Sequence, residues 1–175
     1  MVERARAGDR DAFDALVAAH LSSTFRTALA ILDSEADARD ACQDAFLKAW
    51  RELPRLRDVD RFDAWLGRIL VNACRSVLRT RRRRDVREIP VDNPSATRLV
   101  PQTRAFDDQL GEFDALQHAF ARLSVDERTL LALHYLEHRG LVEIAEILRV
   151  PQGTVKSRLH AARRSFARAL EVRAR

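Results

Sequence analysis

The segment 141–160 carries side chains that can read bases in duplex DNA, at helical spacing on both sides of a short break. Two apolar faces recur there, one at Ile144, Ala145 and Leu148 and the other at Val155, Leu159, Ala162 and Phe166. Two helices can therefore pack at a steep angle around Val150. Pro151 suits the first turn of the second helix, and Gly153 is expected to relieve the turn. The pattern predicts a helix-turn-helix.

The outward face of the second predicted helix is basic and rich in hydrogen-bonding groups. It presents Lys156, Ser157, His160, Ala161 and Arg164. Such a face suits a helix that enters the major groove, where base edges offer a distinct pattern of donors and acceptors. A helical hairpin with a solvated basic face is the alternative interpretation.

Arginine supplies nearly all the positive charge of the 175-residue chain. The net charge is +5, the pI is about 10.1, and only Lys48 and Lys156 are lysines. Guanidinium groups bind phosphate in a planar, bidentate geometry, and four of them are consecutive at 81–84. The composition favours a polyanionic partner.

Helical periodicity predicts an all-α fold. The hydrophobic content is 46%, with five Gly and five Pro. We expect a helical pair divided at Ser22-Ser23, a long helix capped by Asp33-Ser34 that ends before Pro54, a loop over 54–61, and a helix from Phe62 whose last turns are rich in arginine. A further helix is expected from Phe113, and Ser124 to Glu127 resembles a capping box.

Periodicity lapses from 85 to 112, where Pro90, Pro94, Pro101 and Gly111 interrupt the chain. The segment is acidic, which suits either an occupant of a nucleic-acid channel or a segment that only aids solubility. We therefore predict two small helical domains, residues 1–84 and 113–175, joined by a flexible linker over 85–112.

Several other functions find no support in the sequence. Cys42 and Cys74 lie in helical patterns and are expected to be buried, reduced thiols. We expect no membrane insertion and a cytoplasmic location, because no apolar run approaches about 20 residues and the N-terminus lacks the apolar core of a signal peptide. His134 and His138 lack a third ligand, so no metal is expected. With no phosphate-binding glycine loop or nucleophile elbow, we expect neither a cofactor nor an enzyme.

Two blocks of the sequence resemble extracytoplasmic-function (ECF) sigma factors, the small two-domain members of the sigma-70 family. Residues 37–50, from Asp-Ala-Arg-Asp-Ala to Lys-Ala-Trp, and residues 62–72 resemble their domain 2. Glu143-Ile-Ala and the run from Gly153 to His160 are similar to their domain 4. The resemblance implies a factor that binds core RNA polymerase, directs it to specific promoters and promotes DNA melting, under the control of an anti-sigma factor.

The resemblance also implies which residues dock on the polymerase. Asp40, Gln43, Asp44 and Leu47 would contact the clamp helices of the beta-prime subunit. These positions share one helix face, so carboxylates and an amide can meet a basic coiled coil. Without the resemblance, an ordinary solvated acidic face would be the simpler interpretation.

The same resemblance implies that the loop 54–61 and the helix after it bind the minus-ten promoter DNA. The implied contacts are Arg57, Asp58, Phe62, Trp65, Arg68, Asn72, Arg75 and Arg79. An extruded base needs a stacking wall and a few hydrogen-bonding groups, whereas spaced arginines can follow a phosphate backbone. Phe62 and Trp65 also fit a core stripe, so we expect Trp65 in the core and Asn72 to read the base.

The same resemblance implies that the helix-turn-helix binds the minus-thirty-five element. Lys156, Ser157 and His160 would read bases, with Arg158, Arg163 and Arg164 directed toward phosphates. A stand-alone helix-turn-helix regulator is the main alternative, but it gives Asp40, Gln43 and the Asn72 helix no role. A decoy that sequesters a sigma inhibitor is another, although it would not need an arginine-rich DNA-binding helix.

Overall fold

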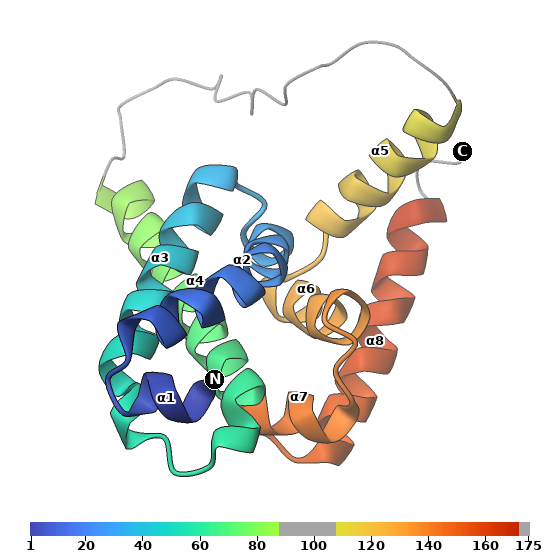
Figure 1. Cartoon of the computed structure of the whole chain (residues 1–175). Coiled ribbons are helices and arrows are strands. Elements are labelled where there is room, and N and C mark those ends of the chain that lie inside the picture. The colour runs from blue at the N-terminus through green and yellow to red at the C-terminus, as the bar shows by residue number, and fades with distance from the viewer. Residues whose placement is uncertain (88–107, 172–175) are drawn as a thin grey trace.

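The computed structural model describes residues 1–87 and 108–171, and the side chains of 1–83 and 115–171 within them. Every regular element in these ranges is helical, which confirms the all-α prediction. Helices α1–α4 form an N-terminal domain, on the left in Figure 1, and α5–α8 form a C-terminal domain, on the right. Most of the predicted linker lies outside the described residues, although α4 and α5 reach into its two ends at Arg87 and Asp108.

The N-terminal domain consists of α1 (Val2–Arg6), α2 (Arg10–Leu32), α3 (Glu35–Glu52) and α4 (Phe62–Arg87). Asp9 caps α2 by accepting a 3.0 Å hydrogen bond from the Ala12 amide. Ser34 caps α3 by accepting a 3.3 Å hydrogen bond from the Asp37 amide, after Asp33 ends α2 in the left-handed conformation. The predicted start of the long helix is therefore confirmed.

Helix α2 is continuous, so the predicted helical pair divided at Ser22-Ser23 is wrong. Serine is tolerated inside this helix because its hydroxyl can bond back to the preceding turn: the Ser23 Oγ donates to the His20 carbonyl at 3.0 Å. The inward face also continues across the two serines, because His20 and Ser23 are half-buried between the buried residues Leu16 and Thr24. Tertiary packing thus outweighs the weak helix propensity of serine.

By length and composition alone, α2 could cross a membrane, the one helix in the described ranges that could do so. The expectation that no stretch approaches that length is therefore wrong. Its apolar side packs against α3, α4 and α6, and Phe13, Leu16 and Ile31 are among its buried residues. A core helix has the same composition, and the packing accounts for it.

The connection between α3 and α4 contains two single 3-10 turns, η1 (Leu53–Arg55) and η2 (Val59–Arg61). Leu53 is fully buried and anchors the first turn. Asp58 caps the second, accepting a 3.1 Å hydrogen bond from the Asp60 amide. The first turn therefore packs on α1 and α3, and the second packs on α4.

The C-terminal domain consists of α5 (Asp108–Ala121), α6 (Val125–Leu131), the π-helical turn η3 (Ala132–Leu136), α7 (Leu141–Leu148) and α8 (Gln152–Glu171). The capping box is confirmed, because Ser124 and Glu127 each accept a hydrogen bond from the other's backbone amide. Helices α7 and α8 form the predicted helix-turn-helix.

The turn between α7 and α8 differs from the prediction in one respect. Arg149 takes the left-handed conformation, with φ 56°, whereas Gly153 lies inside the first turn of α8. Pro151 stands just before α8, and its carbonyl accepts a 2.9 Å hydrogen bond from the Thr154 amide. A left-handed residue directly after α7 is a common helix ending, so the glycine is not needed for the turn.

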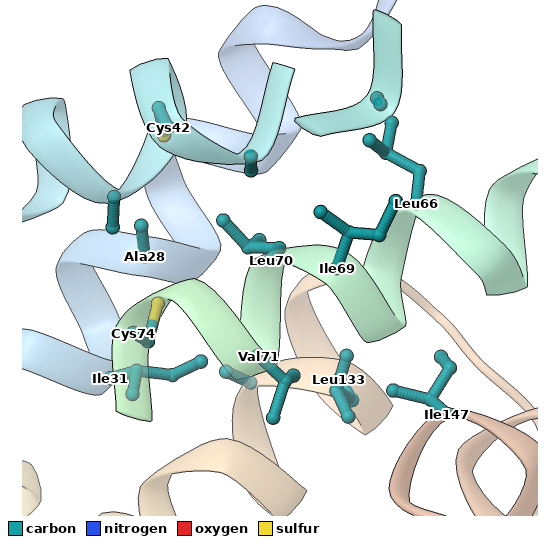
Figure 2. Close-up of a cluster of buried hydrophobic side chains, with 14 of the residues drawn as sticks. Ala28, Ile31, Cys42, Leu66, Ile69, Leu70, Val71, Cys74, Leu133 and Ile147 are labelled. Carbon is teal, nitrogen blue, oxygen red and sulfur yellow. The ribbon is translucent and has the colours of Figure 1, made fainter. Parts of the chain in front are cut away.

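The buried core is continuous across the two domains. Ile31 and Val71 of the N-terminal domain lie beside Leu133 of the C-terminal domain in Figure 2. Cys42 and Cys74 are free and buried, as predicted, and burial raises the pKa of their thiols to about 11 and about 12. The described residues contain no cluster of histidine, cysteine and carboxylate groups that could hold a metal ion.

Candidate nucleic-acid interface

The loop before α4 and the first turns of α4 line a cleft of about 430 Å³. Its lining combines apolar and charged side chains: Leu56, Arg57, Asp58, Arg61, Ala64, Trp65, Arg68, Glu146 and Arg149. The half-buried indole of Trp65 is its only aromatic wall. A flat apolar surface beside guanidinium and carboxylate groups can stack a base and hydrogen-bond its edge.

Phe62 supports this cleft from behind. Its side chain is only 4% exposed and packs edge-on against His20, with ring centroids 5.4 Å apart. Its ring also lies 5.7 Å from that of Trp65. Phe62, named with Trp65 for the base pocket, is therefore a core residue, whereas Trp65, expected in the core, packs against it but is half-buried and lines the cleft.

A stripe of polar side chains continues from the cleft along α4. Trp65, Arg68, Asn72, Arg75 and Arg79 follow one another at spacings of three or four, which places them on one face over about 21 Å of helix. Asn72 and Arg79 are exposed, and Arg68 and Arg75 are half-buried. The stripe is long enough to follow about six nucleotides at 3.4 Å each.

The outward face of α8 is a second basic surface. Lys156, Ser157, Arg158, His160 and Arg164 are exposed, while Val155, Leu159 and Ala162 on the opposite face are buried. The apolar side therefore fixes α8 to the domain and leaves the whole polar side available to a groove.

Arg163 differs from its neighbours because the domain already holds its guanidinium group. It donates to His134 Nε2 at 3.1 Å and lies over the Tyr135 ring at 5.6 Å. Since that nitrogen accepts, His134 Nδ1 carries the proton and donates to the Arg139 carbonyl at 3.1 Å. The histidine therefore has a structural role.

The remaining predicted face lies on α3. Asp40, Gln43, Asp44 and Leu47 are all exposed, and Leu47 is 47% exposed despite its apolar side chain. Gln43 and Leu47 also line a cleft of about 380 Å³ together with Arg10, Phe13, Asp14, Phe46 and Trp50. The α2 contribution to this cleft was not predicted, because only the tertiary packing brings Asp14 beside α3.

The structure thus joins Arg57, Asp58, Trp65 and Arg68 in one cleft and leaves Asn72 a turn further along α4. It also places Glu146 and Arg149, from the C-terminal domain, in the wall of that cleft. Sequence patterns carry no signal for this addition, because the two segments are about 85 residues apart.

A helical chain with one helix-turn-helix and a second arginine-lined helix has the architecture of a two-domain DNA-binding transcription factor. Residues 16–84 match the family described as Sigma-70 region 2, and residues 113–166 match Sigma-70, region 4. The chain is 31% identical to the RNA polymerase sigma-H factor of Pseudomonas aeruginosa, over 98% of this chain and 92% of the relative. It is 32% identical to the ECF RNA polymerase sigma-E factor of Haemophilus influenzae, over 93% and 89%.

Two solved structures are similar over both domains. One is CnrH in complex with the cytosolic domain of CnrY, with a TM-score of 0.70, 26% identity, and coverage of 98% of this chain and 95% of that chain. The other is RpoE with the anti-sigma factor NepR from Bartonella quintana, with a TM-score of 0.71, 26% identity, and coverage of 91% and 97%. The chain belongs to the sigma-70 family, as a sigma factor of the ECF type. It is a transcription initiation factor that binds core RNA polymerase and directs it to promoters.

Proposed function

We propose that each of the three exposed surfaces carries out a different step of transcription initiation. The α3 face binds core polymerase, the cleft and stripe of α4 open the minus-ten element, and α8 reads the minus-thirty-five element. The domains that carry these tasks span residues 1–84 and 113–175. The observation that best supports this assignment is the α4 stripe, which runs from an aromatic cleft into a row of arginines.

Asp40, Gln43, Asp44 and Leu47 are the polymerase contacts in this proposal. Exposed carboxylates on the helix whose Gln43 and Leu47 line a cleft suit basic clamp helices of the beta-prime subunit, because charge steers the encounter while Leu47 is removed from water. The four alanines buried on the opposite face of α3 fix the helix in the domain, so these side chains present a rigid surface.

At the minus-ten element, Trp65 stacks on an extruded base and Arg57 and Asp58 bond to its edge. Asn72 reads a neighbouring base of the non-template strand, and Arg68, Arg75 and Arg79 follow the backbone. Phe62 takes no direct part, because it lies beneath Trp65.

The proposal also covers cofactors, cellular location and a regulatory partner. The protein needs no cofactor and catalyses no reaction of its own, because the polymerase forms the phosphodiester bonds. It works in the cytoplasm, where DNA and polymerase are found. One similar structure was solved with the cytosolic domain of CnrY and the other with the anti-sigma factor NepR, so we also expect a separate anti-sigma factor to bind this chain.

In vitro transcription with core polymerase tests the assignment. The double variant Gln43→Ala and Leu47→Ala should weaken core binding, measured by a pull-down titration, and lower transcript yield in proportion. Leu21→Ala is the matched control, because Leu21 is 48% exposed on α2, outside the proposed face. A stand-alone regulator would instead bind promoter duplex without core and yield no promoter-dependent transcript with it, which would refute the proposal.

A further inference from the structure

One arginine of α8 is held in place by its own domain, unlike its basic neighbours. The side chains of Lys156 and Arg164 are exposed and make no hydrogen bond or ion pair with the described residues. Arg163 is also exposed, but it donates to His134 Nε2 at 3.1 Å and lies 5.6 Å from the centre of the Tyr135 ring. A guanidinium group carries several N–H donors, and this bond uses one of them. The others remain available to a phosphate.

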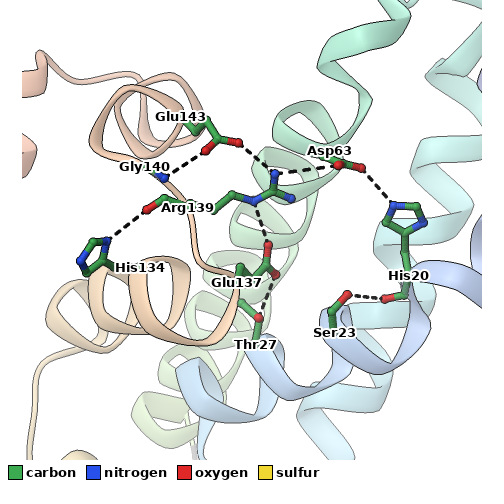
Figure 3. A network of polar contacts seen from close by, with 9 residues as sticks. All are labelled: His20, Ser23, Thr27, Asp63, His134, Glu137, Arg139, Gly140 and Glu143. Carbon is green, nitrogen blue, oxygen red and sulfur yellow. Dashed lines mark hydrogen bonds and ion pairs between the residues drawn. The ribbon is translucent and has the colours of Figure 1, made fainter.

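His134 connects Arg163 to two further parts of the domain. A guanidinium group can only donate, so Nε2 of the ring accepts, and Nδ1 donates its proton to the Arg139 carbonyl at 3.1 Å (Figure 3). Arg139 is itself held by Glu143 at 3.0 Å and by Glu137 at 3.3 Å. One imidazole ring therefore links α8 to η3 and to the residues that lead into α7.

The π-helical turn η3 brings two adjacent rings to the same guanidinium group. In this turn the Glu137 amide donates to the Ala132 carbonyl at 3.2 Å, five residues back. The wider turn reduces the angle between consecutive side chains, and the rings of His134 and Tyr135 pack edge to face with centroids 4.8 Å apart. Tyr135 is 52% exposed, so its ring covers Arg163 at the surface of the domain rather than in the core.

Arg163 lies on the same side of α8 as Lys156. Seven residues separate them, which corresponds to about two turns, about 10 Å of rise and a rotation of about 20°. A recognition helix reads bases with its first residues, and phosphate contacts fix its register in the groove. Arg163 is therefore placed to bind a phosphate beside the groove while Lys156 reaches a base.

Attachment of α8 to the domain does not require these polar contacts. Val155, Leu159 and Ala162 are buried on the inner face of the helix and already fix it. The bond between Arg163 and His134 is exposed, and an exposed polar contact adds little to the free energy of folding. The arrangement therefore serves the orientation of the guanidinium group more than the stability of the fold.

From these contacts we infer that His134 and Tyr135 are positioning residues of the minus-thirty-five surface, because they orient the Arg163 guanidinium group so that its free donors bind a DNA phosphate. The inference rests on the proposed role of α8 and extends that surface onto η3. Ordering of a long side chain during binding lowers affinity by about two- to tenfold. An arginine that is already ordered avoids this loss.

Holoenzyme assembled with each variant provides the test. The probe is a promoter duplex that wild-type holoenzyme selects from a random-sequence library. Fluorescence anisotropy measures binding at low temperature, where the strands stay paired, over a range of salt concentrations. The slope of affinity against salt reports how many phosphates are contacted, and the affinity at fixed salt also includes the cost of ordering side chains.

The variants separate the two hydrogen bonds of His134. His134→Asn keeps an amide N–H near the position of Nδ1, which can donate to the Arg139 carbonyl, but it removes the acceptor for Arg163. His134→Gln places an amide oxygen near the position of Nε2 and keeps that acceptor. Tyr135→Leu removes the aromatic face, whereas Tyr135→Phe retains it. Arg122→Ala is the control for lost positive charge, because Arg122 is exposed just after α5, outside α8.

Arg163→Ala should weaken binding and reduce the salt slope by about one, as expected for one lost phosphate contact. His134→Asn and Tyr135→Leu should weaken binding by about two- to tenfold with little change in slope, because the contact still forms but has to be ordered. His134→Gln and Tyr135→Phe should stay within about twofold of wild type. In the Arg163→Ala background His134→Asn should have no further effect, a coupling that a purely structural histidine would not show.

Three results would overturn the inference. Arg163→Ala matches Arg122→Ala in affinity and salt slope, or His134→Asn binds as tightly as wild type, or His134→Asn costs as much in the Arg163→Ala background as alone. The proposed role of α8 fails separately if Lys156→Ala leaves affinity and base preference unchanged, because the Lys156 side chain makes no hydrogen bond or ion pair with the described residues.

Discussion

Replacement of Lys156 by alanine should weaken recognition of closed promoter duplex. Lys156 is exposed on α8 and has no hydrogen bond or ion pair among the described residues, so no internal contact has to break before it binds DNA. A hydrogen-bonded lysine contact to guanine contributes about 1–3 kcal/mol of discrimination. The variant should therefore lose about 5- to 150-fold in affinity at a cognate site and discriminate less at one minus-thirty-five position.

Asn72→Ala should affect a different step. Asn72 lies on the exposed side of α4, one turn beyond the Trp65 cleft, and would meet a base that is available only after strand separation. Closed-complex binding should stay within about twofold of wild type, because a single neutral side chain contributes little to phosphate contacts. Permanganate-reactive open complex should fall.

The assay compares linear promoter DNA with a template already melted around the minus-ten element. The premelted template should restore much of the transcription lost by Asn72→Ala and little of that lost by Lys156→Ala. Arg168→Ala is the matched control, because Arg168 lies on α8 about 18 Å further along the helix and its loss changes the charge equally. Rescue of Lys156→Ala but not of Asn72→Ala would refute the assignment of both domains.

Three further predictions concern stability and chemistry. Arg139→Met should lower the free energy of unfolding by about 2–3 kcal/mol in urea titrations at pH 7, because it removes the cation beside a nearly buried Glu137 and leaves that carboxylate only the Thr27 hydroxyl; a loss below that of Arg122→Met would contradict this. Burial raises the pKa of Glu127, but hydrogen bonds from Ser165 and Ser124 outweigh it, so the pKa in the folded protein lies below 4.5. The ionised carboxylate therefore stabilises the fold above pH 4.5, and this stabilisation is lost as the pH falls through the pKa of the folded protein. Glu127→Gln should therefore lose less stability than wild type between pH 7 and pH 3. Because burial raises the pKa of Cys42 and Cys74, both thiols should react with Ellman's reagent at pH 8 only as fast as the protein unfolds.

Local features of the fold followed from the sequence because their causes are local. Ser34 and Ser124 cap the helices expected of them, and the helix-turn-helix forms where apolar residues recur at helical spacing. The errors arose where tertiary packing outweighed a local signal. Ser22-Ser23 looked like a break, but the face that packs on the domain continues across it. Gly153 looked like the turn residue, although Arg149 takes the left-handed conformation.

Site residues were harder to predict, because exposure depends on partners far away in the sequence. Phe62 and Trp65 are equivalent in a periodic pattern, and only the packing of His20 on Phe62 decides which ring is buried. The partner of Arg75 is Asp126, on a helix beyond the predicted linker. No local pattern links residues so distant, so this ion pair could not be foreseen.

The chemistry of arginine also bears on the polar stripe of α4. A guanidinium group stays charged at every physiological pH, so the arginines of the stripe can bind phosphates whatever the base sequence. Arg75 makes an ion pair with Asp126, and Arg61, before the stripe, makes one with Glu146. Because exposed ion pairs contribute only about 0–1 kcal/mol each, DNA phosphates can replace these carboxylates at little cost.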